Sequence, residues 1–186
     1  MAIDICQYRR ELAGTDPSDE KVDTMDDTIA APFRSRELSL EPGWIDYNGH
    51  LNLAYYHVLF DRGIDDLFDA IGLGERYRER TGFTTYTAEA HVRYLKEVPP
   101  GARVIVSTMI VGLDEKRLHM FQEMHHTDGW LAATLENLSL SIDQRGVAPK
   151  VAPFPAETFQ RVKAAFEVHT TLPRPAELCR AIRPLV

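Results

Sequence analysis

Apolar side chains recur at three- and four-residue steps between residues 53 and 71. The repeating positions are Leu53, Tyr56, Phe60, Ile64, Leu67 and Ile71. This spacing places them on one face of an amphipathic helix, which is expected to stop at Gly72 and Gly74. Gly63 weakens a helix by ~1 kcal/mol, so its presence inside this one predicts a close approach between the helix and a sheet.

Strand patterns lie on both sides of this helix. One strand is expected before it, over 33–40, and a second, short helix after it, over 75–80. Four longer strand-like segments follow, rich in apolar and β-branched residues and separated by turn signals such as Asp128-Gly129: 83–98, 103–113, 117–127 and 130–143. One strand, a long helix and four antiparallel strands predict an α+β fold.

The two ends of the chain are expected to differ from this central part. Residues 1–31 are polar and acidic and predict an arm or linker, with a short helix at most over 5–12. The main domain is expected over 32–146. Residues 147–186 are expected to form a helix and an extended tail packed on the same domain, and the helix has one apolar stripe of Phe159, Val162 and Phe166.

Composition narrows the class of protein. The chain has 186 residues, of which 44% are hydrophobic and 26% charged, and its formal net charge is −7. This charge argues against binding nucleic acid through phosphate neutralisation, although a local Arg/Lys patch can still hold an anionic coenzyme. No stretch approaches the ~20 apolar residues of a membrane span. Cys6 and Cys179, without an export signal, indicate a cytoplasmic protein, and a disulfide between them stays an alternative.

The densest polar segment directly precedes the long helix. Asp46, Asn48, His50 and Asn52 fall within seven residues, and each group would need a partner if it were buried. A loop is therefore expected here, with Asn52 capping the helix. The N–H groups at and after Leu53 would then form an oxyanion site that faces the Asp46 carboxylate.

This segment resembles the D-x-x-x-H-x-N signature of hotdog-fold acyl-CoA thioesterases, with Asp46, His50 and Asn52 at the fixed positions and aromatic residues after them: Tyr55, Tyr56 and Phe60. The resemblance extends over residues 33–143. Two later segments, 86–96 and 114–121, are similar to a narrower subgroup, the betainyl-CoA thioesterases of carnitine breakdown. The resemblance implies a long central helix wrapped by a curled antiparallel sheet of about five strands.

The activity implied by the resemblance is hydrolysis of an acyl-CoA thioester, with betainyl-CoA converted to glycine betaine and CoA in carnitine catabolism. Another short-chain acyl-CoA is an alternative substrate, and a non-catalytic acyl-CoA-binding hotdog dimer is an alternative of another class. CoA belongs to the substrate, so no separate cofactor is implied, and the seven histidines lack metal-ligand spacing. A hotdog hydratase is disfavoured, because its D-x-N-P-x-H motif places His five residues after Asp.

Five residues are candidates for the chemistry: Asp46, Asn48, His50, Asn52 and Glu89. Asp46 would attack the thioester carbonyl or activate a water that does. The alternative for Asp46 is a turn aspartate that bonds its own backbone. Some family members carry the carboxylate on the helix instead, which makes Asp61 and Asp65 rival candidates, although a solvated helix face explains both.

Glu89, His91 and Arg93 alternate with Ala88, Ala90, Val92 and Tyr94 along one predicted strand. The second set is expected on the core face and the first on the other face. The first set is then a solvent-facing row, or it meets the loop of a partner subunit, since hotdog subunits resemble one another in pairing edge to edge. A homodimer or a dimer of dimers is therefore expected.

A substrate with a quaternary ammonium would be bound by an aromatic cage, worth ~0.5 to 2 kcal/mol per well-placed ring. Each available ring is alternatively plain core. Arg117, in a strand turn, is either a surface residue or a contact for CoA phosphates. The predicted substrate-binding residues are Trp44, Tyr47, Leu53, Tyr55, Tyr56, Tyr86, His91 and Arg117, with Trp130 as a further ring.

Overall fold

The structure is a computed structural model that describes residues 30–178 and residue 182. The arm expected over 1–31, its short helix and both cysteines lie outside the described residues, apart from Ala30 and Ala31. The elements are β1 (Phe33–Arg34), β2 (Leu38–Ser39), the 3-10 helix η1 (Pro42–Trp44), α2 (Leu53–Ala70), α3 (Glu75–Thr81), β3 (Phe83–Tyr94), β4 (Arg103–Leu113), β5 (Arg117–His126), β6 (Leu131–Asp143), β7 (Lys150–Val151) and α4 (Ala156–His169).

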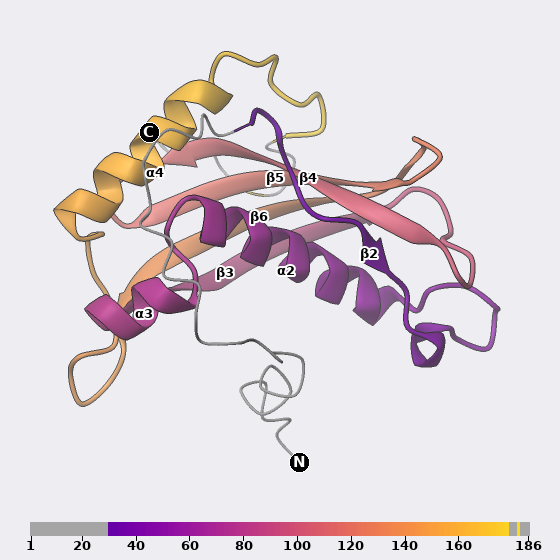
Figure 1. The fold of residues 1–186 in the computed structure, drawn as a ribbon, viewed down its shortest axis with the longest axis horizontal. Coiled ribbons are helices and arrows are strands. Elements are labelled where there is room, and N and C mark those ends of the chain that lie inside the picture. The colour runs from indigo at the N-terminus through magenta and orange to yellow at the C-terminus, as the bar shows by residue number, and fades with distance from the viewer. Residues whose placement is uncertain (1–29, 179–181, 183–186) are drawn as a thin grey trace, which may run out of the picture.

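The sheet is antiparallel and has seven strands in the order β1-β4-β5-β6-β3, with β2 also paired to β4 and β7 to β6. The long helix α2 runs along one face of this curled sheet, and α4 lies beyond one end of α2 (Figure 1). The predicted α+β hotdog architecture is confirmed. The strand count exceeds the expected five because the first predicted strand is divided in two and β7 is added.

The strand predicted over 33–40 is interrupted at Ser35. The Ser35 N–H donates to the Val106 carbonyl at 2.9 Å, and the Ser35 hydroxyl accepts from the Val106 N–H at 3.0 Å. A side chain thus takes the place of a ladder carbonyl, which separates β1 from β2. The strand predicted over 83–98 ends early for a different reason, because the N–H groups of Leu95 and Lys96 both donate to the same backbone carbonyl, that of Ala132, which breaks the regular ladder.

Helix α2 buries the predicted face against the sheet. Tyr56, Phe60, Ile64, Leu67 and Ile71 are all buried, and Asn52 caps the helix by accepting from the Ala54 N–H at 3.0 Å. Leu53 was expected on this face, but it is 63% exposed. It occupies the first helical position beside the polar loop, and the face joins the core only at Tyr56, one turn later.

The core has two parts that meet along α2. The first half of α2 packs with β2, β4 and β6, and the second half packs with α3 and α4. His169 ties α4 to the sheet, because its Nδ1 accepts from the Ile110 N–H at 2.8 Å. Burial lowers the pKa of His169, which favours the neutral ring that this acceptor role requires.

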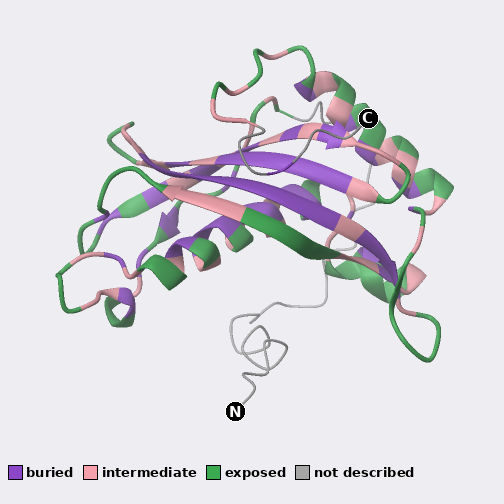
Figure 2. Ribbon diagram, turned by 180° about the vertical axis from the view of Figure 1, so that it is seen from behind, coloured by how far each residue is buried: buried purple, intermediate pink, exposed green. Residues whose placement is uncertain are grey.

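Strand β3 forms one edge of the sheet. It pairs with β6 and ends the strand order, and residues 86–90 along its middle are exposed. Figure 2 shows this exposed stretch beside the buried central strands.

Among the described residues, no helix is both long and apolar enough to cross a membrane.

The close approach predicted at Gly63 is present. A Cβ added there would lie 2.7 Å from both Cβ and Cγ1 of Val106, a stiff β-branched side chain that is fully buried. We expect Gly63→Ala to lower the free energy of unfolding by up to about 2 kcal/mol, because overpacking costs about 1–3 kcal/mol and the helix-propensity gain of ~1 kcal/mol offsets part of it.

Chemical denaturation of four proteins would measure this effect: wild type, Gly63→Ala, Val106→Ala and the double variant. Val106→Ala removes Cγ1, one of the two atoms at 2.7 Å, and keeps Cβ. The double variant should therefore be relieved in part and be more stable than the sum of the two single losses predicts. Additive losses would show that the contact does not limit the packing of α2.

Candidate active site

The signature loop folds back on itself between η1 and α2. An isolated bridge joins Ile45 and Leu51, and the Asp46 N–H donates to the His50 carbonyl at 3.0 Å. Gly49 permits the turn because its φ is +81°, a left-handed conformation that favours glycine. The loop is therefore a closed turn that holds its polar side chains next to the start of α2.

The Asp46 carboxylate takes part in this turn. One oxygen, Oδ1, accepts from the Asn48 N–H at 2.8 Å, and the other, Oδ2, lies 3.5 Å from the Asn48 side-chain nitrogen. These bonds are those of the turn aspartate considered as the alternative. They also fix the direction of the carboxylate, so the geometry is compatible with both interpretations, and the catalytic role of Asp46 stays a prediction.

The start of α2 offers fewer free amides than expected. Asn52 Oδ1 occupies the Ala54 N–H, and the Tyr55 N–H donates to the Asn52 carbonyl at 3.0 Å. The Leu53 N–H precedes both and belongs to the first four amides, which have no carbonyl within the helix to bond. Leu53 is therefore the better candidate for the oxyanion donor, and its exposed position suits that role.

His50 contacts a residue that sequence reasoning did not select. Its Nε2 lies 3.3 Å from Oε2 of Glu97, in the segment after β3. The same segment is tied to the loop because the Leu51 N–H donates to the Val98 carbonyl at 2.9 Å. Nothing in the local pattern around Glu97 indicates this contact, which depends on the return of the chain from β3.

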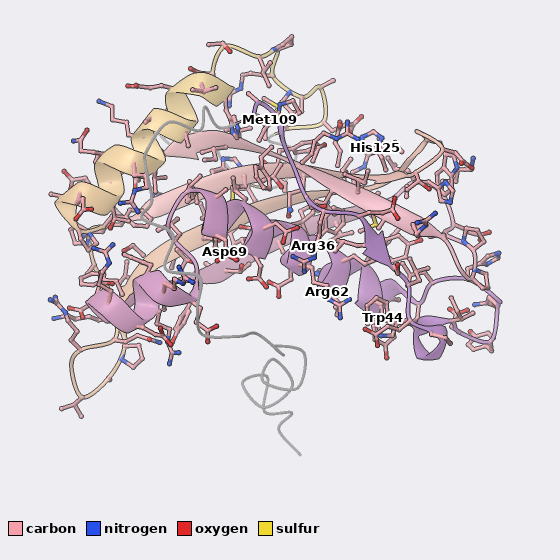
Figure 3. The ribbon with its side chains drawn as sticks, in the orientation of Figure 1. Arg36, Trp44, Arg62, Asp69, Met109 and His125 are labelled. Carbon is pink, nitrogen blue, oxygen red and sulfur yellow. The ribbon has the colours of Figure 1, made fainter. Side chains whose placement is uncertain are left out.

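The two indoles of the predicted cage already have cationic partners from the protein. Trp44 stacks on Tyr55 with ring centroids 5.1 Å apart, and the Arg62 guanidinium lies 4.8 Å from its centroid. Arg62 and Trp44 are neighbours beside α2 in Figure 3. Trp130 stacks on His126 at 4.7 Å, and the Lys96 ammonium lies 4.3 Å from its centroid.

The tyrosines of the predicted cage have separate surroundings. Tyr56 meets Tyr94 edge to face at 5.1 Å, and burial raises its pKa. The Tyr86 hydroxyl accepts from the Gln144 side chain at 2.7 Å, and Tyr47 is 97% exposed. Within the part of one chain that the structure describes, these rings therefore do not converge on one cage.

Glu89 and His91 lie on the sheet face opposite α2. Their neighbour Ala90 pairs with Asn137 and lines a cavity on the α2 side, so the alternation of the strand sends Glu89 and His91 to the other face. There the negative charge of Glu89 acts on His119. Glu89 is also five strand residues from Tyr94, about 17 Å, and the chain contacts the signature loop only beyond Tyr94, where Glu97 meets His50.

The sheet face opposite α2 holds a buried, hydrogen-bonded pair of titratable side chains. His119 Nε2 lies 2.9 Å from Glu136 Oε1, and both side chains are almost fully buried. Burial lowers the pKa of His119, whereas the Glu136 contact acts in the opposite direction. Arg93, also on this face, pairs with Glu177 of the C-terminal segment. These contacts secure the sheet and its tail at a distance from the signature loop.

Arg117 occupies the turn between β4 and β5. Its Nε donates to Asp114 Oδ2 at 2.6 Å, and hydrogen bonds from the Arg117 side chain and from the Lys116 and Arg117 amides lower the pKa of Asp114 despite its partial burial. This turn lies at the far end of β4 from the signature loop, since the loop neighbours the start of that strand. The surface-turn interpretation fits this position in one chain.

An open cavity of about 320 Å³ lies between α2 and the edge strand β3. Its lining mixes apolar side chains with a few polar ones: His57, Val58, Phe60, Asp61, Ile64, Thr87, Ala90, Leu135 and Asn137. Of the two rival helix carboxylates, Asp61 lines this cavity. Asn137 was not selected from the sequence, because its strand also carries Thr134, Glu136, Ser139 and Ser141 and nothing in the pattern singles out one of these polar residues as a ligand contact.

Asn137 is held in place at the cavity floor. Its side-chain nitrogen donates to Thr87 Oγ1 at 3.3 Å, and its oxygen accepts from the Ser139 hydroxyl at 2.9 Å.

Across residues 30–178, no group of three or more His, Cys, Asp or Glu side chains has the arrangement of a metal site.

Comparison with known proteins gives the family. A model of the thioesterase-like superfamily matches residues 40–166. A betainyl-CoA thioesterase of Pseudomonas aeruginosa is 39% identical over 147 residues, which cover 78% of this chain and 91% of that protein. An L-carnitine dehydrogenase/betainyl-CoA thioesterase of Rhizobium meliloti is 34% identical over 147 residues, but this chain spans only 29% of its length.

A solved structure supports the same assignment. A Staphylococcus aureus protein in complex with CoA superimposes with a TM-score of 0.71 at 28% sequence identity, covering 84% of this chain and 98% of that one. The fold, the signature loop at the start of α2 and the match over residues 40–166 agree, and the chain belongs to the thioesterase-like superfamily.

Proposed function

We propose that this protein hydrolyses betainyl-CoA to glycine betaine and coenzyme A. The observation that carries the proposal is the 39% identity to a betainyl-CoA thioesterase across 91% of that protein's length. The signature loop supports the thioesterase chemistry, since it presents Asp46 beside the N-terminus of an 18-residue helix.

This geometry supports the following proposed chemistry. The thioester carbonyl oxygen accepts from the Leu53 N–H, and the positive end of the helix dipole stabilises the negative charge that develops on that oxygen. Asp46 either removes a proton from a water that attacks the carbonyl carbon or attacks it directly. The bond between the carbonyl carbon and sulfur then breaks. In the water route, the proton that Asp46 removed passes to the leaving sulfur, and CoA leaves as the thiol with glycine betaine as the acid. In the direct route, CoA leaves as a thiolate that takes a proton from solvent, and water then hydrolyses the anhydride between Asp46 and the betainyl group. His50 and Glu97 fix the turn that carries Asp46.

Asp46→Asn tests the role of the carboxylate. Asparagine can still accept from the Asn48 N–H, so the turn and the thermal stability should be retained. The negative charge is lost, and we expect kcat for thioester hydrolysis to fall by about 10²- to 10⁴-fold, the usual contribution of an acid–base group. Release of free CoA thiol is the measurement. Turnover near that of wild type would assign the chemistry to Asp61, Glu89 or another group.

We infer that two chains pair through β3. This edge strand is exposed in its middle, and unpaired strand edges are normally covered. The cavity between α2 and β3 is lined at this edge by Thr87 and Ala90, so a second chain there would also supply its remaining wall. The pairing would place Glu89 and His91 beside the seam between subunits.

Sedimentation at micromolar concentration should therefore give twice the chain mass of 21.1 kDa, or four times that mass for a dimer of dimers. A matched experiment dilutes the protein and measures its mass and its rate of thiol release per chain. Both quantities should fall over the same range of protein concentration. A monomer with full activity would contradict the pairing.

The substrate is tested with two thioesters of the same shape. Betainyl-CoA carries a trimethylammonium group, and its neutral analogue carries a tert-butyl group in the same position. We expect kcat/KM to favour the cationic thioester by ~1 to 3 kcal/mol, or about 5- to 150-fold. Equal values of kcat/KM would remove the betaine assignment and favour another short-chain acyl-CoA, while the thioesterase chemistry at Asp46 would stand.

A further inference from the structure

One edge of strand β4 is covered over only part of its length. β1 and β2 pair with this edge no further than Thr108, so among the described strands none continues the pairing beyond that residue. The Ile110 N–H lies past this point, and it donates to Nδ1 of His169 at 2.8 Å. A side chain from the end of α4 thus replaces a strand at an edge where free backbone groups favour unwanted pairing.

His169 joins three parts of the chain and is 1% exposed. Its Nδ1 accepts from Ile110 on β4, and its Nε2 lies 3.3 Å from the Ala30 carbonyl. A neutral imidazole has one N–H and one free lone pair, so both contacts are satisfied when Nε2 carries the proton. A protonated ring would turn a second N–H toward the Ile110 N–H, and the bond to β4 would be lost.

Residues 170–178, here called the C-terminal segment, follow His169 (Figure 1). None of these residues is buried. A cavity of about 320 Å³ is lined by Leu172, Pro173 and Pro175 from the segment and by Met109 and Phe121 from the sheet face opposite α2, among others. The segment therefore lies over this face without dense apolar packing.

Polar contacts hold the C-terminal segment instead. Arg174 Nη2 donates to the Val111 carbonyl at 3.5 Å, and Glu177 forms an ion pair with Arg93 of β3. A segment with few buried apolar contacts opens at low cost in free energy compared with the core. The bond from Ile110 to the buried His169 is then the firmest anchor at the start of the segment.

A second buried histidine lies close to the C-terminal segment. His119 is 0% exposed, its Nε2 lies 2.9 Å from Glu136 Oε1, and among the described residues its Nδ1 has no hydrogen-bond partner. Three charged side chains act on it: Glu136 from β6, Glu89 from β3 and Arg174 from the segment. Protonation of His119 would therefore place a second positive charge near Arg174.

We propose that the C-terminal segment is a strap that acid releases from the sheet, with His169 as its anchor and His119 as a second sensor. At neutral pH both rings are neutral and the segment stays in place. In acid, protonation of His169 breaks the bond to Ile110, and protonation of His119 repels Arg174. Release uncovers the edge of β4 and the sheet face that carries Met109 and Phe121.

The sign of the pH dependence follows from the surroundings of the two rings. Burial lowers the pKa of His169 below its ordinary value of 6.5, against the effect of the Ala30 carbonyl, and no charged side chain of the described residues is a cause of this shift. Burial also lowers the pKa of His119, against the Glu136 and Glu89 charges and together with that of Arg174. The closed form therefore prefers neutral rings, and its stability is lost as the pH falls below the ordinary value.

Hydrogen exchange of the Ile110 amide measures the release. The experiment compares wild type, His169→Asn, His119→Gln and the double variant at about pH 7.5 and about pH 5.5, with each rate divided by the intrinsic rate at that pH. A histidine that stays neutral in the closed form favours release by about tenfold one pH unit below its ordinary pKa. Wild type should therefore open about 10- to 100-fold more at the lower pH.

The variants keep the hydrogen bonds but do not titrate. Asparagine at 169 can accept from the Ile110 N–H in place of Nδ1, and glutamine at 119 can donate to Glu136 in place of Nε2. Each single variant should lose up to about tenfold of the acid effect, and the double variant should exchange equally at both pH values.

His126→Asn is the matched control. His126 stacks on Trp130 and is seven strand residues from His119, about 23 Å, so its loss should leave the acid effect unchanged. Exchange within α2 should stay slow at both pH values, which separates release of the segment from unfolding of the whole chain.

Two outcomes would overturn the strap. Equal corrected exchange of Ile110 in wild type at both pH values would show that acid does not release the segment. An acid effect of full size in the double variant would assign the titration to other groups. Thermal melting checks the folding of each variant, and His169→Gln replaces His169→Asn if the latter does not fold. No thioester enters the measurement, so its result is independent of the proposed function.

Discussion

The contact between Gly63 and Val106 sets how closely α2, the helix that borders the candidate site, lies on the sheet. Because Gly63 has no side chain, α2 can lie directly on β4, and the rest of its apolar face then fits the curl of the sheet. The helix in turn fixes three things at once: its N-terminus beside the signature loop, the exposed residues along its flank and the cavity against β3. A looser contact would displace all three together, since they belong to one rigid element.

Much of this arrangement was predictable because it depends on local patterns. The apolar repeat of α2, the cap at Asn52 and the hairpin at Asp128-Gly129 are encoded by neighbouring residues, and the structure has them at the expected places. The break at Ser35 was not predictable, because it arises from a hydroxyl that reaches the distant Val106 amide. The same is true of Leu53, which lies on the apolar face by periodicity but outside the core.

The site was predicted in part for the same reason. The signature loop is continuous in sequence, so its polar residues were recognised together. The cavity is assembled from α2, β3 and β6, and only the fold shows that Asp61, Thr87 and Asn137 share it. Two other kinds of contact likewise join segments far apart in the chain: that between His50 and Glu97 and those of the cations over both indoles. The sequence alone does not show these cations, so the rings were predicted to bind a ligand.

The two stacked indoles also determine what tryptophan fluorescence reports. The chain contains two tryptophans. Trp44 ends the short helix before the signature loop, and Trp130 is contacted by Lys96, the neighbour of Glu97. Both tryptophans therefore lie at the end of the molecule that carries the loop, each in contact with its own stacked ring and cation. Emission will follow events at that end, whereas loosening of α4 at the opposite end will leave the spectrum largely unchanged.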